Sequence, residues 1–332
     1  MQLDKTAIVI RQRNAVELFD LSLMVLRKHF VPIILTSALF GLPFAVFNGL
    51  STAWILSEDS YLVAENLDSP QVWLRWRHLF HNCLLFVLQF QLVSLPTTIF
   101  LGNRIFFEPV DFRSLMVSLR KVLWPTILVL GVFRFGILCL CIEYFVDRST
   151  LWDWSAEFFW LIIPACVVLF LRAAWPFAPE IIGLERCPLR KSHPKEITVR
   201  ERSNGLHRLM VSDNIARFMG AAIVGGMFGL MMLALSIWTK GIVTNDWMWN
   251  DWCNIIVVPL SLWFVGLLMT VFRFLSYLDS RIRLEGWEIE LRVKAEAARL
   301  VRPSVATRSS TLVDDDSREQ KAEGQKTEVS ST

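Results

Sequence analysis

Long apolar runs alternate with short charged segments along most of this 332-residue chain. A helix needs about 20 mostly apolar residues to cross a bilayer. Six runs satisfy that requirement, and we predict spans at residues 30–56, 79–101, 122–145, 158–177, 218–238 and 254–275. Proline lies inside several of them, which packed membrane helices tolerate because neighbouring groups satisfy the freed carbonyls. The pattern therefore predicts an all-α polytopic membrane protein with six transmembrane helices.

The basic residues predict the direction of these spans. Of the 34 Lys and Arg residues, 28 lie in the N-terminal segment, the loops 102–121 and 181–217, and the chain from residue 273 onward. The three alternate loops hold 4, and the other 2 are Arg134 and Arg172 inside spans. Positively charged loops stay in the cytoplasm. We therefore predict a bacterial cytoplasmic (inner) membrane protein with both termini in the cytoplasm.

Four regions follow from this topology. Residues 1–29 form a cytoplasmic N-terminal segment, in which Val16, Phe19, Leu23 and Leu26 recur at helical spacing and predict an amphipathic helix at the membrane surface. Residues 30–275 form the six-helix membrane domain. Residues 276–301 are predicted to be a second cytoplasmic amphipathic helix. The tail, 302–332, is so polar that disorder is expected.

The chain also repeats a short motif. SLMVLRKHFVPIIL at 22–35 matches SLMVSLRKVLWPTIL at 114–128, and a fainter copy, RLMVSDNIARF, stands at 208–218. Each copy precedes an outward span, which predicts three repeated helical hairpins, each led by a cytoplasmic interfacial helix. The alternative is chance similarity, because apolar segments resemble one another in composition.

Arg134 is the candidate of greatest interest, because a charge in mid-span costs from a few to more than about ten kcal/mol unless it faces protein or water. Asn48, Gln89 and Gln91 lie in neighbouring predicted spans and can hydrogen-bond it, so we predict an intramembrane polar cluster of these four residues. It can bind an anion or lipid headgroup, or it can tie helices together, and the sequence favours the tie. Arg172 is expected to reach lipid phosphates near the inner boundary.

The other motifs give weaker indications of a functional site. Gly225 and Gly229 form G-x-x-x-G, which predicts close helix packing. His78 and His81 lie at the outer end of a span without evident further metal ligands, and we interpret them as hydrated interfacial side chains. No acid within the spans shows a partner. The cysteines lack metal-binding spacing, no phosphate-binding loop is present, and topology explains the basic loops without nucleic acid. We expect neither cofactor nor metal.

Two stretches, RQRNAVELFDLSLMVLRKHFVPIIL at 11–35 and FRFLSYLDSRIRLEGWEIELRVKAEAARL at 272–300, resemble a diffuse group of uncharacterised bacterial multipass membrane proteins. The chain is also similar to the membrane domain attached to some glycerophosphodiester phosphodiesterases. The catalytic domain of those enzymes is absent, so no catalytic residue is carried over. The resemblance implies an inner-membrane accessory protein.

Two functions are compatible with these features. The first is a non-enzymatic membrane scaffold or assembly protein, whose partners are membrane lipids and proteins that dock on the C-terminal helix. The alternative is a transporter or binding protein for a small anionic solute or a lipid, because internal repeats and an intramembrane arginine occur in carriers.

Overall fold

The computed structural model describes residues 13–57, 70–105, 111–145, 158–191, 193, 196–208 and 210–285, and every regular element in these ranges is helical. Five helices are long and apolar enough to cross a membrane, and the number is six if one bent pair counts as a span. The five are Phe30–Leu56, Gln71–Arg104, Phe112–Phe133, Val211–Thr244 and Cys253–Glu285. This confirms the predicted all-α class and agrees with a multipass membrane protein.

The first hairpin begins with a separate short helix. α1 (Ala15–Lys28) ends where His29 leaves the helical region at φ −119°, ψ 32°, and α2 (Phe30–Thr52) then runs into the 3-10 turn η1 (Ala53–Leu56). The returning segment consists of α4 (Pro70–Val93) and α5 (Leu95–Ile105). The predicted N-terminal helix is therefore present, with a bend between it and the span.

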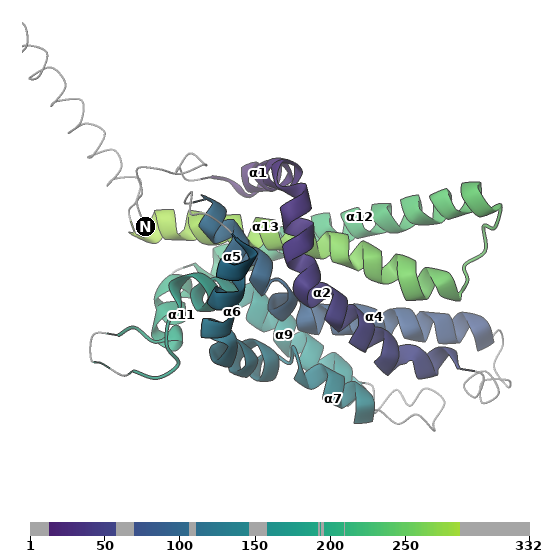
Figure 1. Cartoon of the computed structure of the whole chain (residues 1–332), viewed down its shortest axis with the longest axis horizontal. Helices are drawn as coiled ribbons and strands as arrows, with labels where there is room; N and C mark the ends of the chain where they lie inside the picture. The colour runs from purple at the N-terminus through teal and green to yellow at the C-terminus, as the bar shows by residue number, and fades with distance from the viewer. Residues whose placement is uncertain are drawn as a thin grey trace, which may run out of the picture.

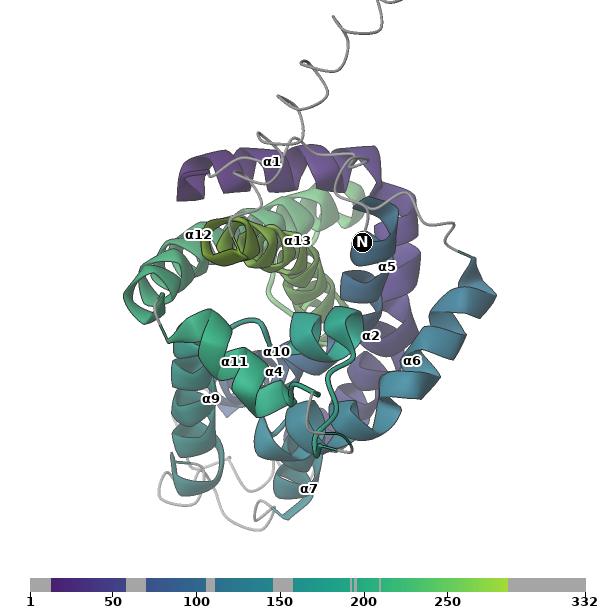
Figure 2. The same ribbon diagram turned by 90° about the vertical axis from the view of Figure 1, so that its left-hand side faces the viewer.

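α1 packs on α13 (Val258–Glu285), the last described helix, and lies across it in Figure 2. The rings of Phe19 and Phe272 stack with centroids 4.0 Å apart, and Leu18 is fully buried. Val16 and Leu23, on the apolar face that the sequence predicts, are exposed instead. α1 thus buries one side in protein and presents apolar side chains on another, as a helix at an apolar–polar boundary does.

The third predicted span, 122–145, is broken in the middle. α6 (Phe112–Thr126) continues into the π-helical η2 (Ile127–Phe133), and α7 (Leu138–Phe145) follows after four residues. Phe135 there has a positive φ of 58°. A Cβ on Gly136 would lie 2.5 Å from the Leu130 carbonyl oxygen, so only glycine allows this close approach. The break is therefore local, and Pro125 does not cause it.

The fourth predicted span, 158–177, ends inside a bend. η3 (Phe158–Ile162) and α9 (Ile163–Ala174) lead to α10 (Ala178–Glu180) and the π-helical η4 (Ile181–Glu185), and the two halves differ in direction by 71°. A residue before proline disfavours helical torsions. Trp175, which precedes Pro176, accordingly leaves the helical region, with φ −130° and ψ 68°.

The last hairpin is the longest. α11 (Val199–His207) precedes α12 (Val211–Thr244), and the chain returns through the π-helical η5 (Cys253–Val257) into α13. Figure 1 shows α12 and α13 extending to the right, away from α11 at the left. We call the left side, where α12 begins and α13 finishes, the α11 end. α13 runs unbroken to Glu285, so no boundary separates a span from a second helix near 275, and the rest of the predicted 276–301 helix and the tail lie outside the described residues.

The three motif copies differ locally. The first is divided between α1 and α2, the second starts in α6 and continues straight into its span, and the third straddles the start of α12. The three-hairpin repeat stays a prediction.

His207 at the α11 end is fully buried and must be neutral. The Phe177 backbone N–H donates to its Nε2 at 3.3 Å, and its Nδ1 donates to the Ser203 carbonyl at 2.7 Å. Because a backbone N–H can only donate, Nε2 carries no proton. Burial lowers the pKa of His207 to about 4, from the 6.5 of an exposed imidazole. At pH values between these two, the native state therefore binds fewer protons than the unfolded state.

The lowered pKa of His207 predicts that the folded protein loses stability as the pH falls. Its contribution to stability is complete above pH 6.5 and is lost as the pH falls toward about 4, because protonation then favours unfolding. Between pH 7 and pH 5 we expect the free energy of unfolding in detergent to fall by about 2 kcal/mol. His207→Gln keeps an acceptor for Phe177 and does not titrate, so its loss over this interval should be smaller by that amount. Equal pH profiles for the two proteins would contradict this role.

Candidate functional site: a buried arginine cluster beside two cavities

Arg134 lies at the break in the third span and ties it to the bend in the fourth. Its guanidinium donates to Oε1 of Gln91 and to the Trp175 carbonyl at 2.8 Å. Nε2 of Gln91 donates to the Pro176 carbonyl at 3.3 Å. These carbonyls stand where the helix is interrupted, and buried backbone groups inside a membrane protein need a partner. The geometry of Arg134 is that of a structural tie.

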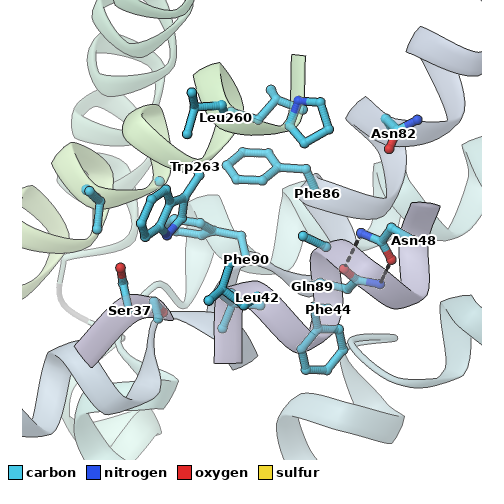
Figure 3. Close-up of a pocket in the computed structure, with 18 of the residues that line it drawn as sticks. Ser37, Leu42, Phe44, Asn48, Asn82, Phe86, Gln89, Phe90, Leu260 and Trp263 are labelled. Carbon is cyan, nitrogen blue, oxygen red and sulfur yellow. Dashed lines mark hydrogen bonds between the residues drawn. The ribbon is translucent and has the colours of Figure 1, made fainter. Parts of the chain in front are cut away.

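The other two residues of the predicted cluster bind each other rather than Arg134. The side-chain amides of Asn48 on α2 and Gln89 on α4 exchange two hydrogen bonds of 2.8 Å, drawn in Figure 3. This pair lines a cavity of 310 Å³ between α2, α4 and α13, with Phe86, Phe90 and Trp263 around it. The predicted four-residue cluster is thus two separate pairs, because Gln89 and Gln91 point to different sides of α4.

Arg273 and Glu180 form a buried ion pair that the sequence did not indicate. Nε of Arg273 lies 2.8 Å from Oε1 of Glu180, whose side chain is fully buried. Nη2 of Arg273 also donates to the hydroxyls of Ser94 and Thr98 at 2.9 and 3.2 Å. The pair joins α13 to the short α10, and the 71° bend is what brings Glu180 to this position.

Arg172 on α9 is buried without a carboxylate. Its Nη2 donates to the Leu88 carbonyl at 3.2 Å, and its guanidinium lies over the Phe90 ring, 5.5 Å from the centroid. Arg273 lies over the same ring at 5.4 Å. No ion pair reaches Arg172 within the described ranges. We predicted that this side chain extends to lipid phosphates at the boundary; it is instead 7% exposed, because α9 bends beyond it and the chain covers it.

Arg172 and Arg273 border a larger cavity, of 580 Å³, between α4, α9, α12 and α13. We call it the arginine cavity, and its polar lining residues at the α11 end are Gln91, Arg172, Asn214, Arg217, Arg273 and Ser276. The remaining lining is almost entirely apolar or small. Such a cavity, apolar with a few convergent polar groups, is the usual form of a ligand site. Arg134 is not among its lining residues.

Four donor groups on the wall of the arginine cavity lack an acceptor. They are Arg172 Nε, Asn214 Nδ2, Arg217 Nη1 and Arg273 Nη1, all buried and without a hydrogen-bond partner among the described residues. Arg172, Asn214 and Arg273 are each more than nine-tenths buried. Leaving a buried donor unpaired costs about 1–3 kcal/mol, more for a charged group. These donors converge on one cavity, so a single acceptor placed there would satisfy several of them.

The glycines of α12 belong to the same cavity. A Cβ on Gly225 would lie 2.8 Å from Cε of Met269, and one on Gly229 would lie 3.1 Å from Cγ2 of Val265. α12 and α13 therefore approach closely at these two positions, as the G-x-x-x-G spacing predicts. Gly226, also in the lining, has no atom within 4 Å of such a Cβ.

His78 and His81 are buried, which corrects the interpretation that they are hydrated. Nδ1 of His81 lies 2.8 Å from Oε1 of Glu143 on α7, and both side chains are fully buried. His78 lies 3.3 Å from the Thr52 hydroxyl. An acid inside the third span therefore does have a partner, contrary to the sequence interpretation, because α7 packs beside α4. No group of three potential metal ligands occurs in the described residues.

No protein-family model matches this chain, and neither the curated proteins nor the solved structures compared with it give a match.

Proposed function

We propose that this protein binds an anionic ligand within the membrane, in the arginine cavity, and that it does so without catalysing a reaction. The observation that carries the proposal is the set of unpartnered N–H donors around Arg172, a buried charge without a carboxylate among the described residues. Isolated buried charges are strongly unfavourable. An anion among these donors neutralises Arg172 and accepts the free hydrogen bonds at once.

This proposal favours the second of the two functions compatible with the sequence, the transporter or binding protein for an anionic solute or lipid. Sequence reasoning preferred the scaffold because ionisable groups within the predicted spans are few and no paired acid among them suggests proton coupling; Arg134 itself is bonded as a tie. The cavity depends on other arginines. A scaffold role for the C-terminal helix, and the resemblance to phosphodiesterase membrane domains, stay predictions, since the scaffold surface lies mostly outside the described residues.

Inorganic phosphate is the simplest probe. We expect the thermal midpoint of the purified protein, in a neutral detergent, to rise with phosphate and to rise less with chloride at equal ionic strength. A ligand that binds only the native state stabilises it by mass action, by about 2.7 kcal/mol at a hundred times its Kd. Identical responses to the two salts would contradict a specific anion site.

The proposed orientation places the α11 end in the cytoplasm of a bacterium, with the protein in the inner membrane. The motivation is the excess of basic residues in the segments on that side. Reporters fused after Arg186 and after Arg302 should indicate the cytoplasm, and reporters near Glu65, Arg148 and Asn245 the exterior. An exterior signal after Arg186 would overturn both the orientation and the span count.

A further inference from the structure

Polarity in the arginine cavity is graded along its length. The charged and amide side chains all lie at the α11 end, whereas the opposite half is lined by residues such as Leu79, Leu233 and Val258. On α12 the lining extends from Asn214 to Leu233. At 1.5 Å per residue this is about 29 Å, close to the thickness of one hydrocarbon core. A compact anion uses only the polar end of such a site.

The apolar half of the arginine cavity opens sideways, toward the bilayer. Leu230 lines the cavity and is nevertheless 69% exposed, so it stands at an opening. Of the described residues on α9, only Arg172 contributes to the lining, so α9 does not separate the outer halves of α4 and α12. In Figure 1, α12 also diverges from α4 toward the right, away from the α11 end. A chain in the bilayer can therefore reach the cavity from the side.

The polar end of the arginine cavity has a carboxylate beside it, Asp279, and this carboxylate is ion-paired. Nη2 of Arg217 is paired with the Asp279 carboxylate at 2.7 Å, and that side chain is 2% exposed. The Arg13 backbone N–H also donates to Asp279, at 2.9 Å. Nε of Arg283 also lies 2.9 Å from the Asp279 carboxylate, so two arginines face one acid and this end keeps a net positive charge, which suits an anionic headgroup.

We propose that the ligand of the arginine cavity is a bilayer lipid with an anionic phosphate headgroup. The phosphate lies among Arg172, Asn214 and Arg273, and one acyl chain lies along α12 against Gly226, Leu230 and Leu233. This inference rests on the proposed function and adds the class of ligand to it. Arginine forks suit phosphate oxygens, and the apolar lining takes a chain that a free phosphate lacks.

Two glycines on α12 provide a matched pair of variants. Gly226 lines the apolar part of the cavity, whereas Gly220 does not line it, and a Cβ added at either position would have no atom within 4 Å. Gly226→Phe places a ring where the chain should lie and leaves the arginines unchanged. Gly220→Phe adds the same ring on the same helix outside the cavity. Both substitutions are thus expected to fold.

The experiment measures phosphatidylglycerol bound to delipidated, purified full-length protein by native mass spectrometry, with phosphatidylcholine as the zwitterionic comparison. Wild type and Gly220→Phe should bind phosphatidylglycerol more tightly than phosphatidylcholine. Gly226→Phe should bind phosphatidylglycerol at least about tenfold more weakly, because the ring displaces several methylenes of the chain. Its stabilisation by inorganic phosphate should persist, since the polar end is intact.

Three results would overturn the lipid assignment. In the first, Gly226→Phe binds phosphatidylglycerol as wild type does. In the second, wild type shows no preference for phosphatidylglycerol over phosphatidylcholine. In the third, wild type is stabilised by phosphate and binds no lipid, which leaves the anion site in place with a soluble ligand. If wild type responds to neither phosphate nor lipid, the proposed function itself fails.

Discussion

Replacing Glu180 with leucine is expected to lower the free energy of unfolding by about 3–5 kcal/mol, because it leaves Arg273 charged, buried and without its carboxylate. The Ser94 and Thr98 hydroxyls remain as partners of Arg273, but neither carries a compensating charge. The effect should appear in chemical or thermal unfolding in detergent, monitored by helical circular dichroism.

A double variant separates loss of the pair from loss of packing. Removing both charges, as Glu180→Leu with Arg273→Leu, should recover most of the lost stability, since a buried ion pair is often no more stable than apolar residues of similar size. Glu180→Gln, which keeps the shape and an acceptor, should lie between wild type and Glu180→Leu. If the double variant is no more stable than Glu180→Leu alone, the pair does not account for the effect.

The sequence predicted the class of fold because hydropathy alone determines which segments are long and apolar enough to span a membrane. It placed the ends of the elements less well. Pro125 stays within a helix, as packed membrane helices tolerate. The true break, at Phe135 and Gly136, depends on a close approach to the Leu130 carbonyl that no periodicity encodes. The bend at Trp175, by contrast, was readable from the proline after it.

The candidate site was predicted only in part, because the hydrogen-bond and ion-pair partners of a side chain depend on the three-dimensional fold. Gln91 was correctly placed beside Arg134, since both are polar in adjacent spans. Glu180 falls between the predicted span 158–177 and the basic loop 181–217 and was given no role, and only the bend brings it to Arg273. Arg172 was predicted to lie near the inner membrane boundary and to reach lipid phosphates. It is buried instead, because the chain after α9 folds over it. A signal was available: Glu180 stands in an otherwise apolar stretch, APEIIGL.

Arg134 and Arg172 offer the clearest test of which arginine binds the ligand. Both are buried at the α11 end. The guanidinium of Arg134 donates hydrogen bonds to Gln91 and to the Trp175 carbonyl, and Arg134 does not line the arginine cavity. Arg172 lines the cavity and has a free Nε. The two residues therefore provide matched substitutions, identical in chemistry and different in position.

Arg172→Gln is expected to weaken the stabilising effect of phosphate at least about 30-fold in apparent Kd, because a buried charge-assisted contact typically contributes about 2 kcal/mol or more. Without ligand this variant should be at least as stable as wild type, since an uncompensated buried charge is gone. Arg172→Lys should retain part of the affinity. Arg134→Gln should keep the phosphate response and its stability. Arg134→Leu leaves Oε1 of Gln91 and the Trp175 carbonyl without their donor and should lose about 0.6–2 kcal/mol of stability. A folded Arg134→Gln protein without a phosphate response would move the binding site to Arg134, and an unchanged response in Arg172→Gln would remove Arg172 from it.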